Sequence, residues 1–282
     1  MLTILSGCFN GSTDYIVEEC EGELKQDNEL TGKKEEHSKP NHIDYPTLKE
    51  EIVNKYADVE PKHWGENIDG VITEINADKK VIALTFDACD GEPNGYDSEL
   101  INFLKKEKIP ATLFVSGEWI KKNQDTFLQL AENPLFEIAN HGYKHRPLSV
   151  SGKSIYNISG TESVEEVFEE IYNNQMLIKE LTGDTPNYFR SGTAYYDDVA
   201  IKILNDLDLK PVNYNILGDA GGTFTKEQIF YSLKNASKGS IILFHMNQPN
   251  SPIAEGVKEG VLYLKEQGFQ FIKLSDYHKY LQ

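Results

Sequence analysis

Short apolar runs and helical stretches alternate along the sequence from residue 81 to residue 274. The runs at 81–86 and 241–244 are continuous and rich in β-branched residues, which is typical of strands buried on both faces. The stretches between such runs repeat apolar residues at helical spacing. A strand that alternates with a helix in this way pairs with its neighbours in parallel. About seven rounds of alternation predict an α/β fold, either doubly wound or closed as a (β/α) barrel.

Capping and turn residues set the element boundaries. Ser98 is the predicted cap of a helix that Pro110 ends, Gly183 ends a long helix, and Thr225 forms a capping box with Gln228. The predicted strands are 71–75, 81–86, 111–115, 136–139, 188–189, 211–214, 240–244 and 269–274. The predicted helices are 48–56, 98–109, 119–131, 161–182, 197–207, one that follows 225, and 254–266. We expect the first two strands to form a β-hairpin.

Titratable side chains come directly after several predicted strands. Asp87, His141, Arg190 and His245 each follow a strand, and Asp219 lies in the loop after another. In parallel α/β folds, ligands and catalytic groups collect at the carboxyl ends of the strands. A flat sheet would spread these residues apart, whereas a barrel would bring all of them to one rim. We therefore expect the barrel.

A pair of imidazoles, His141 and His145, predicts a metal site. A compact loop or one helical turn can direct both rings at one ion, and imidazoles with a carboxylate bind zinc and similar divalent metals. The alternative is two solvated surface histidines beside Arg146. We favour the metal site because an acidic turn, with Asp87 and Asp90, also follows a strand.

The other candidate residues each have a structural alternative. His245 titrates near neutrality, which suits proton transfer, or it is a satisfied rim histidine. Arg190 could hold a carboxylate by a forked bond, or form a surface ion pair. Asp219, which lies among small residues, could reach a neighbouring His or Arg, or only form a turn. Cys89 could be a metal ligand or a nucleophile, but we expect a buried small residue, because no basic group lies near it in the sequence.

The charge of the chain limits its partners. Among 282 residues, 45 are acidic and 28 are basic, which gives a net charge of −17. Such a surface repels nucleic acid and anionic membranes, so we expect a neutral or cationic substrate and no nucleic acid. The three cysteines are too few for a disulfide framework or a cysteine-rich zinc site.

The N-terminal residues predict a lipid anchor and a tether. Leu5–Cys8 resembles a bacterial lipobox, in which the cysteine is lipidated, although few residues precede it. Residues 1–42 are therefore predicted as a truncated signal with a flexible tether, because residues 9–42 are polar and poor in apolar side chains. The alternative is a disordered tail. We expect residues 43–80 to form a helix and a hairpin that pack on the barrel of residues 81–282, in an exported lipoprotein of the bacterial cell envelope.

The order of the motifs resembles the polysaccharide deacetylase family, the NodB-homology group or carbohydrate esterase family 4. The motifs in chain order are Thr85–Gly91, His141 with His145, Arg190, Asp219, and Leu243 with His245. The resemblance covers roughly residues 70–282. It implies a distorted (β/α) barrel of seven or eight strands with one divalent metal ion at its rim, and metal-dependent removal of acetyl groups from a polysaccharide.

The resemblance also implies residue roles. It makes Asp87 the general base and Arg190 the residue that orients this base. It makes His245 the general acid and Asp219 the carboxylate that tunes the acid. Leu243 matches the apolar wall behind the acetyl methyl group.

The resemblance makes His141 and His145 metal ligands, with zinc as the expected ion and cobalt, manganese or nickel as alternatives. The metal-binding aspartate of the family falls at Ala88, which has no ligand atom. We expect Asp90 to supply the missing oxygen. A site that uses Asp87 itself, or two histidines and water, is the alternative.

A second departure concerns the third motif, where Ser191–Thr193 replaces the Pro-Tyr of the family. We expect the Thr193 backbone N–H to donate to the oxyanion and Tyr195 to contact the sugar. The expected substrate is an acetylated glycan with N-acetylglucosamine-type units, such as peptidoglycan or a chitin-like polymer. The alternatives are an O-acetyl esterase on a plant or bacterial polysaccharide, and a non-catalytic glycan-binding lipoprotein, which Ala88 would favour.

Overall fold

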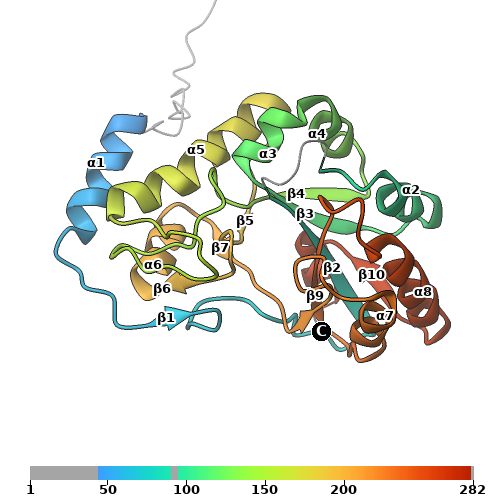
Figure 1. The fold of residues 1–282 in the computed structure, drawn as a ribbon. Helices are drawn as coiled ribbons and strands as arrows, with labels where there is room; N and C mark the ends of the chain where they lie inside the picture. The colour runs from blue at the N-terminus through green and yellow to red at the C-terminus, as the bar shows by residue number, and fades with distance from the viewer. Residues whose placement is uncertain (1–43, 90–94, 281–282) are drawn as a thin grey trace, which may run out of the picture. The chain divides into compact units, whose positions relative to one another are not determined.

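The structure, a computed structural model, describes residues 44–89 and 95–280 (Figure 1). The predicted lipobox with Cys8, the tether and Asp90 lie outside these residues. Among the described helices, none combines the length and the apolar character that crossing a membrane would require.

The centre of the fold is an eight-stranded sheet whose recorded strand pairs are all parallel. Its strands are β2 (Val81–Ala88), β3 (Ala111–Val115), β4 (Phe136–Asn140), β5 (Tyr188–Phe189), β7 (Lys210–Pro211), β8 (Ile216–Leu217), β9 (Ile241–His245) and β10 (Gln270–Ile272). The order is β7-β5-β4-β3-β2-β9-β8, and β10 pairs with β2. The side chains of β2 are buried along its whole length, as its continuous apolar run predicts.

The sheet curls into a barrel-like form. The strands β7 and β8 lie at opposite ends of the strand order, yet only residues 212–215 separate them in the chain. Because a residue spans at most about 3.5 Å, this connection requires the two edges to lie close together. The predicted distorted (β/α) barrel is confirmed. The strand predicted at 211–214 overlaps β7 only at Pro211, and residues 212–214 belong to the connection that crosses the seam.

Helices surround the sheet in two groups (Figure 1). The helices are α1 (Tyr45–Tyr56), α2 (Ser98–Glu107), α3 (Gly117–Lys122), α4 (Gln124–Ala131), α5 (Val164–Thr182), α6 (Asp198–Asp206), α7 (Lys226–Lys234) and α8 (Ile253–Glu266), with a 3-10 helix at Leu274–Tyr280. The apolar faces of α2, α7 and α8 share a core with β2, β3 and β9, whereas α1, α5 and α6 share a second core.

Several predicted boundaries hold and others shift. Gly183 ends α5 in the left-handed conformation, and the capping box of Thr225 with Gln228 is present. The helix predicted at 119–131 is two helices, because the backbone of Asn123 leaves the helical conformation, with φ −129°. The cap of α2 is Asp97 rather than Ser98, and the cap of α5 is Ser163, so this helix begins later than predicted.

The predicted hairpin with residues 71–75 is wrong. Ile72 makes a parallel bridge to Val212, and Glu74 makes an antiparallel bridge to Ser240, so this segment lies across the seam of the barrel. The physical reason is that β3, β9 and β10 already pair with β2, which leaves it no edge for a hairpin partner. A separate two-stranded pair joins β1 (Trp64–Gly65) to β6 (Tyr196–Asp197).

Candidate active site

Asp87 lies near the end of β2 and is 3% exposed. Its Oδ1 accepts a hydrogen bond of 2.6 Å from Arg190 Nη1, and its Oδ2 lies 3.4 Å from His141 Nε2. Burial alone would raise the pKa of Asp87, but the Arg190 guanidinium, together with His141 and His245, lowers this pKa below its usual value. The carboxylate is therefore charged at neutral pH and able to accept a proton.

Arg190 is fully buried and uses its donors on several acceptors. Besides the bond to Asp87, Nε donates to the Val212 carbonyl at 3.1 Å, and Nη2 donates to Thr85 Oγ1 at 3.0 Å and to the Asn213 carbonyl at 2.9 Å. The guanidinium therefore holds Asp87 through one nitrogen rather than the expected fork. Its other bonds fix the guanidinium itself in place.

The two predicted metal-binding histidines lie together, with ring centroids 4.9 Å apart. His141 Nδ1 lies 2.9 Å from the Arg190 carbonyl oxygen, an acceptor, so this nitrogen carries the proton. The Nε2 lone pair is then free, and it faces Asp87 and Cys89. A histidine oriented through its second nitrogen is the usual arrangement of a metal ligand.

Glu170 on α5 holds the loop that carries His145. Its carboxylate accepts hydrogen bonds from the backbone N–H groups of Lys144, at 2.9 Å, and Arg146, at 3.1 Å. A Cβ on Gly142, whose φ is +75°, would lie 2.5 Å from Glu170 Oε1, so the glycine lets the carboxylate approach. Glu170 is not among the residues predicted from the sequence, although an acidic residue between apolar positions of a helix is a signal that could have revealed it.

The loop of the third motif packs against the same histidine. A Cβ on Gly192 would lie 2.2 Å from the backbone carbonyl of His145, a distance that only glycine permits. The position of His145, which itself has a φ of +60°, therefore depends on both Glu170 and Gly192.

Cys89 lies among histidines that are distant in the sequence. Its Sγ is 3.7 Å from His141 Nε2, and the ligand atoms of Cys89, His141 and His145 all lie within 4.8 Å of one another. Cys89 is buried as expected, at 8% exposure, and although no basic group lies near it in the sequence, histidines surround it in space. Burial would raise the pKa of the Cys89 thiol, but His145, His141 and His245 lower this pKa well below its usual value.

His245 at the end of β9 lies opposite Asp87 on the neighbouring strand. Its Nδ1 is 2.9 Å from Asp219 Oδ1, and its backbone N–H donates to Asp219 Oδ2 at 2.6 Å. Burial would lower the pKa of His245, but the Asp219 carboxylate, with a contribution from Cys89, raises it well above its usual value. The imidazole is therefore protonated at neutral pH and able to donate a proton.

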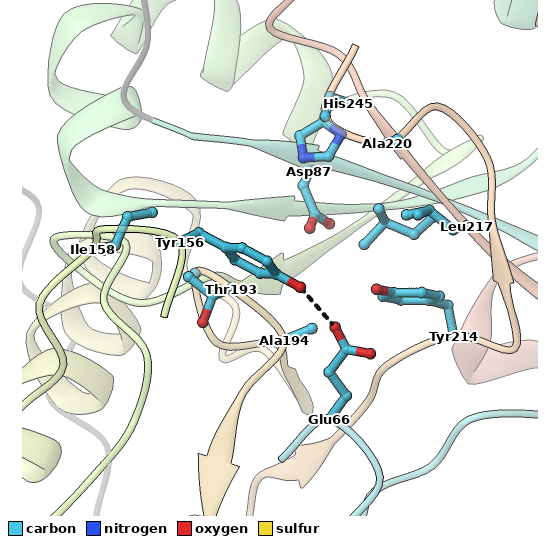
Figure 2. Close-up of a pocket in the computed structure, with 13 residues that line it drawn as sticks. Glu66, Asp87, Tyr156, Ile158, Thr193, Ala194, Tyr214, Leu217, Ala220 and His245 are labelled. Carbon is cyan, nitrogen blue, oxygen red and sulfur yellow. Dashed lines mark hydrogen bonds between the residues drawn. The ribbon is translucent and has the colours of Figure 1, made fainter. Parts of the chain in front are cut away.

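A pocket of about 490 Å³ opens beside these groups. It is lined by Glu66, Asp87, Tyr156, Ile158, Gly192, Thr193, Ala194, Tyr214, Leu217, Ala220, Gly221, Leu243 and His245. In Figure 2, Asp87 and His245 lie above the rings of Tyr156 and Tyr214, and the Tyr156 hydroxyl donates to Glu66 Oε1 at 3.5 Å. Within the described part of the chain, no Lys or Arg lines the pocket.

The predicted substrate-binding residues lie in or beside this pocket. Leu243 and Thr193 line it, and Thr193 Oγ1 is buried with no hydrogen-bond partner among the described residues. Tyr195 does not line it but packs against Tyr156, with ring centroids 5.9 Å apart. The residues predicted from the sequence do not include Glu66, Tyr156 or Tyr214, because each lies in a loop with no motif around it.

A curled parallel barrel with a buried carboxylate, a histidine pair and an acid-linked histidine at one rim has the groups that hydrolytic chemistry requires. A sequence model of the family described as polysaccharide deacetylase matches residues 74–212. The chain belongs to the polysaccharide deacetylase family.

Two curated relatives have names that specify peptidoglycan. A peptidoglycan-N-acetylmuramic acid deacetylase of Bacillus subtilis is 23% identical over 77% of this chain and 81% of its own length. A peptidoglycan-N-acetylglucosamine deacetylase of Bacillus cereus is 25% identical over 75% of this chain and 94% of its own length. Together with the family match, these relatives support a deacetylase hydrolase.

A solved structure with the same fold is a carbohydrate esterase family 4 pseudoenzyme of Bacillus anthracis. It superposes with a TM-score of 0.63 at 19% identity, covering 82% of this chain and 80% of that chain. This likeness shows the fold alone.

Proposed function

We propose that this protein is a metal-dependent hydrolase that removes acetyl groups from an acetylated polysaccharide, by N-deacetylation of N-acetylglucosamine-type units. The observation that carries the proposal is the pairing of Asp87 with His245 on adjacent strands at one pocket. One group is held as a charged base and the other as a charged acid. Hydrolysis of an acetyl amide needs both at the same carbonyl.

A divalent metal ion fits the donor atoms at this rim. Two imidazoles and a thiol converge, and His141 is oriented by a backbone carbonyl in the way that metal ligands require. Zinc suits this donor set best, with cobalt, nickel and manganese as alternatives. When bound, the ion would polarise the acetyl carbonyl and lower the pKa of a water molecule.

The protein residues would divide the proton transfers between them. Asp87 accepts the proton of the attacking water, while Arg190 keeps the carboxylate in position. His245 then donates its proton to the leaving nitrogen as the carbon–nitrogen bond breaks, which releases acetate and a free amine. A nitrogen must be protonated to leave, so a protonated imidazole at this position favours an amide over an ester substrate.

The pocket indicates a neutral sugar. Its lining carries the Glu66 carboxylate and, in the described residues, no Lys or Arg that would pair with an acidic sugar. The rings of Tyr156 and Tyr214 offer flat surfaces for the apolar face of a pyranose. Leu243 would contact the acetyl methyl group, and the Thr193 N–H would donate to the oxyanion.

The proposal is tested by acetate release from N-acetylated chitin oligomers, from peptidoglycan and from acetylated xylan, with and without a chelator. We expect release from the first two substrates, abolished by chelation and reduced at least about 100-fold by His245→Ala. His63→Ala, at an exposed histidine, is the control. Release that survives both chelation and His245→Ala would contradict the proposal. Release from xylan alone would indicate the O-acetyl esterase.

A non-catalytic glycan-binding protein is the second candidate. The observation that favours it is Ala88, which is fully buried in the core where the family places a metal-binding aspartate. Glycan binding without acetate release, in protein loaded with each of the candidate metals, would establish this alternative.

We further propose that the chain acts outside the cytoplasm as a lipoprotein anchored through Cys8, with residues 1–42 as its tether. The lipobox-like Leu5–Cys8 supports this location, as do the peptidoglycan substrates named for the two relatives. Detergent phase partitioning tests it. We expect the wild-type protein in the detergent phase and the Cys8→Ser variant in the aqueous phase.

A further inference from the structure

The end of β2 presents a thiol where the family motif would present a carboxylate. Side chains alternate along a strand, so Asp87 and the residue two positions later face the same side. Ala88 points into the core between helices, with no exposed surface, and cannot reach the rim. Cys89 returns to the side of Asp87, and both side chains approach the same atom, His141 Nε2.

The spacing of the donors matches a tetrahedral metal site. Zinc–sulfur and zinc–nitrogen bonds of about 2.3 and 2.1 Å place two tetrahedral ligands about 3.6 Å apart. The distance between Cys89 Sγ and His141 Nε2 is 3.7 Å. The whole cluster with His145 spans no more than 4.8 Å, so one ion can reach all three donors with small side-chain rotations.

The backbone around the thiol is fixed independently of any ion. The Cys89 carbonyl accepts a hydrogen bond of 3.0 Å from the buried Asn247 side chain. The Ala88 carbonyl accepts one of 3.1 Å from the Ser116 N–H, and the Asp87 carbonyl one of 2.9 Å from the Met246 N–H. The thiol is therefore held facing the histidines before a ligand arrives, which reduces the entropy cost of binding.

We propose that Cys89, as a thiolate, is the third protein ligand of the metal ion held by His141 and His145. This inference rests on the proposed function and specifies its metal centre. A thiolate favours zinc and cobalt over manganese, which prefers oxygen ligands. With Cys89 as the third ligand, the metal ion would need no carboxylate ligand. Asp87 would then remain free to act as a base.

A nucleophilic role for Cys89 fits the contacts less well. A catalytic thiolate pairs with one base and faces the substrate, whereas Cys89 lies among the imidazoles of His141, His145 and His245. It is absent from the described lining of the substrate pocket, although Asp87 and His245 are both part of it. The thiol is therefore placed to bind an ion together with the histidines, and not to contact a substrate in the pocket.

Cobalt spectroscopy on the full chain tests the ligand directly. The variant Cys8→Ser/Cys20→Ser leaves Cys89 as the sole cysteine of the three. Loaded with cobalt(II), this protein should show a sulfur-to-metal charge-transfer band in the near ultraviolet. Zinc X-ray absorption on the same protein should show one sulfur at about 2.3 Å, and this measurement needs no substitution at the site.

Substitutions at Cys89 then measure its contribution. Cys89→Ala should remove the band and weaken zinc binding by roughly 100-fold or more. Loss of a residue that only hydrogen-bonds to a metal ligand already lowers metal affinity by about 10–100-fold. Cys89→Asp should restore binding without the band and reduce the preference for zinc over manganese. A fully loaded cobalt protein without the sulfur band would overturn the thiolate ligand. Metal-dependent acetate release by that same protein would leave the deacetylase proposal intact. Failure to bind any metal would overturn both.

Discussion

Asp87 and Arg190 form an ion pair of 2.6 Å in which both side chains are almost completely buried, at 4% and 0% exposure. A buried pair is costly to break, because the remaining charge loses its partner and has no water to replace it. We expect Arg190→Ala to lower the free energy of unfolding by about 3–5 kcal/mol, measured by chemical denaturation. Lys202→Ala, which removes an exposed ion pair on α6, should leave it nearly unchanged. Equal effects of the two variants would contradict the importance of the buried pair.

The pair of His245 with Asp219 predicts the pH dependence of activity. An acid must be protonated to act, so activity falls as the pH rises through the pKa of His245. Asp219 raises this pKa, and therefore Asp219→Asn should lower it and move the alkaline limb of kcat/KM to lower pH. Rates measured across the pH range check this shift. An alkaline limb that stays in place would exclude His245 as the group that limits the rate. Asp206→Asn, at a carboxylate whose contacts are with Lys55 and Tyr56, is the control.

The contact between Gly192 and His145 predicts a metal-binding defect. An alanine Cβ would lie 2.2 Å from the backbone of His145 and would displace the loop. We expect Gly192→Ala to weaken zinc binding by about 10–100-fold in a competition assay with a coloured chelator. Gly65→Ala is the matched control, because nothing lies within 4 Å of its Cβ position. Unchanged zinc affinity in Gly192→Ala would show that His145 is not a ligand or that its loop adapts.

Tyr156 predicts a substrate-binding contact at the pocket. It is 64% exposed, and its hydroxyl donates to Glu66. We expect Tyr156→Ala to raise KM for a chitin oligomer roughly tenfold with little change in kcat, as for an interaction made equally in the ground state and the transition state. Tyr231→Ala, at a tyrosine of 62% exposure on α7, should change neither constant. A loss of kcat rather than a rise in KM would place Tyr156 in the chemistry instead.

The strand pattern made much of this site predictable. Asp87, His141, Arg190 and His245 could be placed at one rim because each follows a strand, and parallel strands end on the same side. The position of Asp219 was harder to predict, because the strand that precedes it is β8 (Ile216–Leu217) and not the predicted strand at 211–214. The wrong prediction of a hairpin at residues 71–75 shows the limit of local patterns. Whether β2 has a free edge depends on strands that come much later in the chain.

Residues that act through distant contacts were not predictable. Cys89 has no basic neighbour in the sequence, and its histidines come more than fifty positions later. Glu170 acts on a loop that precedes its own helix, and Tyr156 lies in a loop without a motif. Such contacts arise only when the chain folds, so composition and spacing carry no record of them.

The short connection from β7 to β8 makes the alignment of the catalytic base depend on closure of the barrel. Val212 and Asn213, within this connection, supply the carbonyls that accept hydrogen bonds from Arg190. Until the two sheet edges meet, the guanidinium lacks these acceptors and has no fixed direction in which to hold the carboxylate. In a chain whose barrel is not yet closed, the Asp87 carboxylate would consequently be misaligned. The site would become competent for catalysis only when the barrel closes.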